Sequence, residues 1–143
     1  MVDPSLRQSP LATLHLGSRE GPVSHESAVH LAERRAVGKI NLRADPADGA
    51  LMKAFESVLG YALPLKPNRT NGRDSLGALW LGPDEWLITT PEGQETPLFG
   101  ALSTAAEGYH VALNNVSDAR TILTLAGLHA RDVLEKGCSL DLH

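Results

Sequence analysis

The sequence predicts an α+β fold, a split βαβ plait in which an antiparallel sheet carries both helices on one face. Three observations lead to this prediction. β-Favouring runs and apolar helical stripes follow one another in the order strand, helix, strand, strand, helix, strand. The two consecutive strands are joined by a turn that contains Pro83, which indicates a hairpin. A further strand and a short helix follow these six elements.

Lys39 to Arg43 is the first expected strand, because apolar and polar side chains alternate along it. In the helix that follows, Asp45 suits the N-cap and Pro46 the first helical position. Asp48 suits the positive end of the helix dipole, and Gly60 suits a left-handed C-terminal residue. The apolar stripe of this helix consists of Leu51, Met52, Phe55, Val58 and Leu59.

The connection from Leu63 to Asn71 is expected to be irregular because it contains two prolines. Leu76 to Leu81 and Trp86 to Thr90 then form the hairpin. A second helix is expected to start near Thr96 and to stop at Gly108. Its inward side chains are Leu98, Phe99, Leu102 and either Ala105 or Ala106.

The last three elements follow without a long loop. His110 to Asn114 and Thr121 to Ala126 are expected strands, and the second of these alternates as a strand with one well-buried side would. Leu128 to Lys136 is expected to be a helix with Ala130, Val133 and Leu134 on one stripe. Gly137 suits the left-handed residue that closes it.

Residues 1–35 mix proline, serine and charged residues without a sustained period, so we expect a partly ordered N-terminal arm. Ser27 to Arg35 lacks helix breakers, so part of this arm is a candidate helix. Residues 36–143 are expected to form a single α+β domain, since a chain of 143 residues fits one hydrophobic core.

The composition argues against several classes of partner. A net charge of −4 with scattered lysines and arginines argues against nucleic acid and anionic membranes. No apolar stretch is long enough for a signal peptide or a membrane-spanning helix. Cys138 is the only cysteine, so an internal disulfide is impossible and a cytoplasmic location is predicted.

No residue of the sequence is predicted to be catalytic, cofactor-binding or metal-binding. Cys138 and His143 are the only candidate nucleophile pair; no third residue is placed beside them, and a buried, inert thiol is favoured. The six histidines are dispersed, without the spacing of a metal site. The glycines fit neither a dinucleotide-binding loop nor a P-loop.

Three residues are candidates for a subunit interface. Trp80 and Trp86 flank the hairpin turn, where they either pack within the sheet or contact a neighbouring subunit. Arg120 either belongs to a polar loop or pairs with a partner's carboxylate. Both interpretations remain open for each residue.

Four blocks resemble the gamma subunit of heterotetrameric sarcosine oxidase: GKINLRAD from Gly38, LPLKPN from Leu63, LGPDEWLI from Leu81, and a closing segment from Asn114 that ends in KGCSLDLH. The resemblance implies part of the glycine-cleavage aminomethyltransferase fold. Related gamma subunits continue beyond the last block, so the domain is expected to lack their C-terminal part. The isolated chain is then a candidate for self-association.

The resemblance implies a non-catalytic subunit that binds no cofactor itself. Its partners would be the alpha, beta and delta subunits, with FAD, FMN, NAD and tetrahydrofolate held by partner subunits. The complex would demethylate sarcosine oxidatively to glycine, with hydrogen peroxide and either formaldehyde or methylenetetrahydrofolate. Two alternatives remain: a freestanding folate-binding protein of the aminomethyltransferase type, and an interaction module that acts without the complex.

Overall fold

The computed structural model of the protein describes residues 9, 11–14, 28–34 and 37–140. They belong to two compact units, Met1–Arg35 together with Asp118–His143, and Ala36–Ser117. The expected division into an arm of residues 1–35 and one domain of residues 36–143 stays a prediction. In the structure, the residues from Asp118 onward group with the N-terminal residues.

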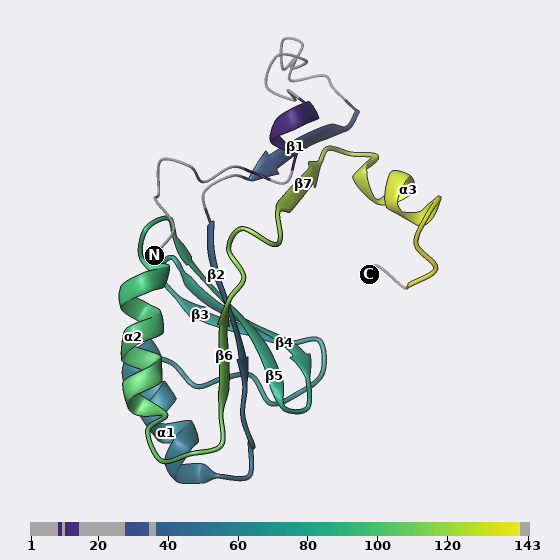
Figure 1. The fold of residues 1–143 in the computed structure, drawn as a ribbon. Coiled ribbons are helices and arrows are strands. Elements are labelled where there is room, and N and C mark those ends of the chain that lie inside the picture. Colours follow the sequence, from purple (N-terminus) through teal and green to yellow (C-terminus); the bar gives the residue numbers. More distant parts are fainter. Residues whose placement is uncertain (1–8, 10, 15–27, 35–36, 141–143) are drawn as a thin grey trace. The chain divides into compact units, whose positions relative to one another are not determined.

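Five strands form the sheet of the larger unit, in the spatial order β3, β4, β5, β2, β6, and all neighbours are antiparallel. The elements are β2 (Val37–Arg43), α1 (Gly49–Leu59), β3 (Thr70–Arg73), β4 (Leu76–Gly82), β5 (Glu85–Pro91), α2 (Glu95–Ala105) and β6 (Ala112–Asn115). Both helices lie on the same side of this sheet (Figure 1). Apart from β3, the element order is the predicted one, so the α+β plait is confirmed.

The core lies between the helices and one face of the sheet. Antiparallel register places Ile40 opposite Ile88 and Leu42 opposite Trp86, and all four side chains are fully buried. The apolar stripe of α1 contributes Leu51, Phe55 and Leu59 to this core, as predicted, and α2 contributes Leu102. Met52, Val58, Leu98, Phe99, Ala105 and Ala106 are partly buried against the same cluster.

Helix α1 starts three residues later than the sequence predicts. Asp48, rather than Asp45, is its N-cap, and the Asp48 carboxylate accepts hydrogen bonds from the backbone N–H groups of Ala50 and Leu51. Asp45 instead accepts a bond from the Ala47 N–H at 2.8 Å, which holds the chain in a turn before the helix. The C-terminal prediction is confirmed, because Gly60 is left-handed with φ of 80°.

Strand β3 was not predicted. The connection expected to be irregular up to Asn71 already becomes a strand at Thr70. The last proline of the connection is Pro67, so from Thr70 onward every residue has an N–H available for pairing with β4. The prolines therefore exclude regular structure only in the first part of this segment.

The smaller unit contains a two-stranded antiparallel sheet. Its elements are η2 (Ala12–Leu14), β1 (His30–Arg34), β7 (Ile122–Ala126) and α3 (Ala130–Glu135), and β1 pairs with β7. The candidate helix within 27–35 is wrong over the described residues, because β1 is a strand. Its pairing with β7 is a long-range contact that a local pattern does not reveal.

The closing segment keeps its predicted elements but differs in detail. Strand β7 has no fully buried residue, and Leu123 is 54% exposed, so the expected well-buried side is absent. Gly137 does not adopt the left-handed conformation. Instead, the N–H groups of Gly137 and Cys138 both donate to the Leu134 carbonyl and close the last turn of α3.

Among the described residues, no helix combines the length and the apolar character needed to cross a membrane.

Tyr61, which follows α1, is a buried phenol. Its side chain is 8% exposed, and its hydroxyl has no hydrogen-bond partner among the described residues. Burial disfavours the phenolate and raises the pKa of Tyr61 to about 12. The folded chain therefore keeps this proton at a higher pH than the unfolded chain does.

We expect Tyr61→Phe to flatten the alkaline pH dependence of stability. The raised pKa of Tyr61 stabilises the folded chain fully below the pKa of the unfolded chain, which is about 10. This stabilisation is lost as the pH rises through the pKa of the folded chain. Urea unfolding should show that the free energy of unfolding decreases between about pH 8 and about pH 11. This decrease should be larger by roughly 1 kcal/mol in the wild type than in Tyr61→Phe. An equal decrease in both proteins would contradict the prediction.

Candidate functional site

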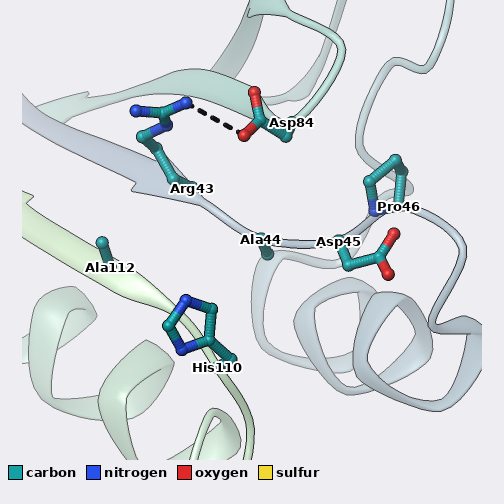
Figure 2. Close-up of a pocket in the computed structure, with 7 residues that line it drawn as sticks. All are labelled: Arg43, Ala44, Asp45, Pro46, Asp84, His110 and Ala112. Atoms are coloured by element: carbon teal, nitrogen blue, oxygen red, sulfur yellow. Dashed lines mark hydrogen bonds and ion pairs between the residues drawn. The ribbon is translucent and has the colours of Figure 1, made fainter.

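An open cavity of about 630 Å³, lined by charged and by small apolar residues, lies where β2 ends in the larger unit. It is lined by Arg43, Ala44, Asp45, Pro46, Asp84, His110 and Ala112 (Figure 2). Three segments contribute these residues: the end of β2 with the turn after it, the turn between β4 and β5, and the start of β6. The cavity exists because β2 runs between β5 and β6 in the sheet.

An ion pair forms one wall of the cavity. The Arg43 guanidinium donates to an Asp84 carboxylate oxygen at 3.0 Å, and both side chains are about half exposed, at 53% and 50%. The backbone also joins these segments, because the Ala44 N–H donates to the Asp84 carbonyl at 3.0 Å. Since the side-chain pair is solvated, its own contribution to stability is small, on the order of 0–1 kcal/mol.

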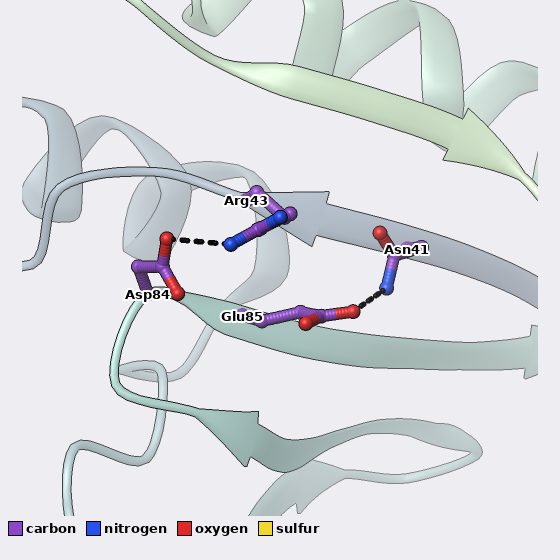
Figure 3. A network of polar contacts seen from close by, with 4 residues as sticks. All are labelled: Asn41, Arg43, Asp84 and Glu85. Atoms are coloured by element: carbon purple, nitrogen blue, oxygen red, sulfur yellow. Dashed lines mark hydrogen bonds and ion pairs between the residues drawn. The ribbon is translucent and has the colours of Figure 1, made fainter.

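A second polar contact continues from the cavity along the sheet. The Asn41 side-chain amide donates to Glu85 at 2.7 Å, beside the pair of Arg43 and Asp84 (Figure 3). Asn41 and Arg43 alternate with the buried Leu42 and therefore lie on the sheet face away from the helices. One face of the sheet therefore carries charged and amide groups, while the opposite face packs in the apolar core.

The lining favours binding of a polar group over covalent chemistry. The one arginine and the two aspartates of the lining leave an excess of one negative charge. The Arg43 guanidinium has five N–H donors, so donors remain for a ligand beside Asp84. Across the described ranges, no cluster of three histidine, cysteine, aspartate or glutamate residues could hold a metal ion.

The sequence does not reveal this cavity. Its residues come from three separate segments, and no binding motif joins them. Asp45 and Pro46 indicated only the start of a helix, and Asp84 lies in the turn of the predicted hairpin. The register that brings Arg43 opposite Glu85 is a property of strand pairing.

The two tryptophans face each other across the hairpin, as the sequence suggests, because Trp80 pairs with Trp86. Trp86 is fully buried, and its indole N–H donates to the Pro64 carbonyl at 2.7 Å. Sheet packing accounts for this residue. Trp80 is partly buried, and no described residue accepts a hydrogen bond from its indole nitrogen. A contact with another subunit stays a prediction.

The other candidate residues lie in the smaller unit. Arg120 is exposed just before β7, and its pairing with a partner stays a prediction. Cys138 is a free thiol that is only partly buried, so it is more accessible than expected. His143 lies outside the described residues, so the structure does not test a pair with Cys138.

Comparison with known proteins shows one consistent similarity. Residues 43–143 match the family model described as "Sarcosine oxidase, gamma subunit family". The chain is 36% identical over 140 residues to sarcosine oxidase subunit gamma of Arthrobacter sp., covering 97% of this chain and 66% of that protein. The subunit of Corynebacterium sp. strain P-1 is 34% identical with the same coverage. The chain thus spans slightly less than two thirds of these relatives.

Solved structures agree with the sequence comparison. A chain of heterotetrameric sarcosine oxidase from Corynebacterium sp. U-96, solved with pyrrole 2-carboxylate, is 34% identical with a TM-score of 0.83. The match covers 96% of this chain and 70% of that one. Aminomethyltransferase T of the glycine cleavage system from Bartonella henselae is 18% identical with a TM-score of 0.60, covering 76% and 32% of the two chains. The second similarity shows a shared fold only.

We expect Trp86→Phe to destabilise the chain more than Trp80→Phe. Both substitutions remove the same atoms, but the first leaves the Pro64 carbonyl unpaired and a gap in the core. The cost should be about 2–4 kcal/mol for Trp86 and below about 1 kcal/mol for Trp80. Urea unfolding of the two variants measures the difference, and equal losses would contradict the assignment of Trp86 to the core.

Proposed function

Because the chain belongs to the sarcosine oxidase gamma subunit family, we propose that it is a non-catalytic subunit of a heterotetrameric sarcosine oxidase. The observation that carries this proposal is the similarity to a chain of the solved oxidase. That similarity extends over 96% of this chain with a TM-score of 0.83. It therefore includes both compact units.

The proposed partners are the alpha, beta and delta subunits. In this assembly, the partner subunits hold FAD, FMN, NAD and tetrahydrofolate. The complex oxidises the methyl group of sarcosine and releases glycine and hydrogen peroxide, while the carbon leaves as formaldehyde or as methylenetetrahydrofolate. We propose that the assembly works in the cytoplasm. This chain supplies contacts within the assembly.

Exposed apolar side chains of the smaller unit support a role in contacts. Leu31, Leu123, Leu128 and Leu140 are 62%, 54%, 94% and 73% exposed. A two-stranded sheet is marginally stable by itself in water, so β1 and β7 gain from a covering surface. We propose that a partner subunit covers these side chains, with Arg120 and Trp80 as further contact residues.

We expect an affinity-tagged form of this chain, co-expressed with the alpha, beta and delta subunits of its own oxidase, to purify with a flavin-containing complex. The purified complex should show a flavin absorption spectrum and should produce hydrogen peroxide from sarcosine. The tagged chain expressed alone is the control and should show neither property. Recovery of the tagged chain without flavin-containing subunits in the co-expression would contradict the proposal.

Titration with tetrahydrofolate distinguishes the proposed subunit role from the alternative of a freestanding folate-binding protein. Under the proposed function, tetrahydrofolate should bind to the complex and leave the isolated chain unbound in calorimetry. Tight binding by the isolated chain would favour a freestanding folate-binding protein.

A further inference from the structure

We propose that the outer edge of β6 is a strand-addition site for an extended segment of a partner subunit, which pairs with β6 and continues into the cavity at Arg43 and Asp84. This inference rests on the proposed function and specifies where one partner binds. It starts from the position of β6, which ends the sheet. Within the described chain, β6 pairs only with β2.

The hydrogen-bond register shows which groups of β6 are free to pair. The Val116 N–H donates to the Lys39 carbonyl at 2.9 Å, while the Lys39 N–H donates to the Ser117 hydroxyl, so Val116 directs its N–H toward β2. In an antiparallel ladder this direction alternates along the strand, so Asn114 and Ala112 also direct their backbone groups toward β2. Leu113 and Asn115 therefore direct their N–H and C=O groups away from β2, at the two-residue spacing that an added strand requires.

Apart from its short length, the sequence of β6 lacks the features that protect sheet edges from pairing. Its sequence, Ala-Leu-Asn-Asn, contains neither a charge nor a proline. Natural edge strands are protected by lysines, prolines, bulges or covering segments. The free groups of β6 are therefore available to another extended chain, as in β-augmentation.

The opposite edge of the same sheet is protected. The Trp80 N–H donates to the Arg69 carbonyl, and the resulting register directs Thr70 and Gly72 of β3 outward. The Asn71 side-chain oxygen accepts the Gly72 N–H at 2.9 Å, and β3 ends in the charged Arg73. One edge thus has an outward N–H bonded internally, whereas the outward N–H groups of β6 have no such partner among the described residues.

The cavity indicates which occupant suits β6. Ala112 begins β6 and lines the cavity together with His110 (Figure 2), so a segment that continues past Ala112 would meet the cavity that Asp45 and Asp84 also line. The excess of one negative charge there favours a basic side chain on that segment. A second copy of this chain fits less well, because the four residues of β6 would be its only proposed contact and bury far less than the roughly 1,200 Å² of a stable interface, whereas an oxidase subunit would contact further surfaces of the chain.

A competition experiment tests the site in the complete complex. A variant and the wild-type chain, carrying different tags, are co-expressed with the alpha, beta and delta subunits, and mass spectrometry measures the ratio incorporated. Asn115→Pro removes an outward N–H and places the proline ring in the path of an added strand, without removing a bond to β2. We expect its incorporation to fall roughly tenfold or more against the wild type.

Two controls match this variant. Asn115→Ala loses the bond between the Asn115 side chain and the Ser117 N–H but keeps the backbone donor, so it should be incorporated like the wild type. Thr70→Pro places the same ring at the outward edge of β3 and should also behave like the wild type. Incorporation of a folded Asn115→Pro chain at the wild-type ratio would overturn the proposal.

Hydrogen exchange of the wild-type chain provides a measurement that does not depend on a proline variant folding. The amides of Leu113 and Asn115 should exchange quickly in the free chain and at least roughly tenfold more slowly in the complex. Equal rates in the two states would overturn the β6 site even if Asn115→Pro fails to fold.

The outcomes separate this inference from the proposed function. If the wild-type chain does not assemble with the oxidase subunits, the proposed function fails and the β6 site fails with it. If it assembles while exchange at Leu113 and Asn115 is unchanged, only the β6 site fails. If light scattering shows a dimer of the isolated chain that Asn115→Pro dissociates, a second copy is the occupant and the partner segment is excluded.

Discussion

The register of β2 between β5 and β6 is the constraint on which the larger unit depends. In this register Ile40 and Leu42 lie under the helices with no exposed surface, while Asn41 and Arg43 lie on the opposite face. A slip by one residue would exchange the two sets, burying an arginine and exposing the core. The register therefore determines both the core and the cavity, because both depend on the alternation of side chains along β2.

Trp86 extends this constraint to the loop after α1. Its ring fills the core opposite Leu42, and its indole N–H holds the Pro64 carbonyl. A proline-rich connection has few N–H groups of its own, so it depends on outside donors to fix its path. Asn71 acts similarly, since its side-chain amide donates to the Ala62 carbonyl at 2.8 Å. These two bonds position the loop that leads into β3 and β4.

The sequence predicts the plait well because its signals are local. The stripe of α1, the left-handed Gly60 and the hairpin around Pro83 each depend on neighbouring residues only. Features that depend on distant residues were missed: β1 forms only by pairing with β7, and the cavity combines Arg43 with His110. The misplaced N-cap is a local failure, because Asp45 and Asp48 both suit capping and the turn made by Asp45 decides between them.

The outward backbone groups of β6 and the exposed leucines of the smaller unit are direct evidence for a role in subunit contacts. A chain that worked alone would gain stability by protecting both edges of its sheet, as it does at β3. The outward donors of β6 lack partners within the described part of the chain, and Leu128 in the other unit is 94% exposed. Each feature costs solubility in an isolated protein and becomes useful only when another chain covers it. Their presence in both units suits a subunit whose contacts are spread over more than one surface.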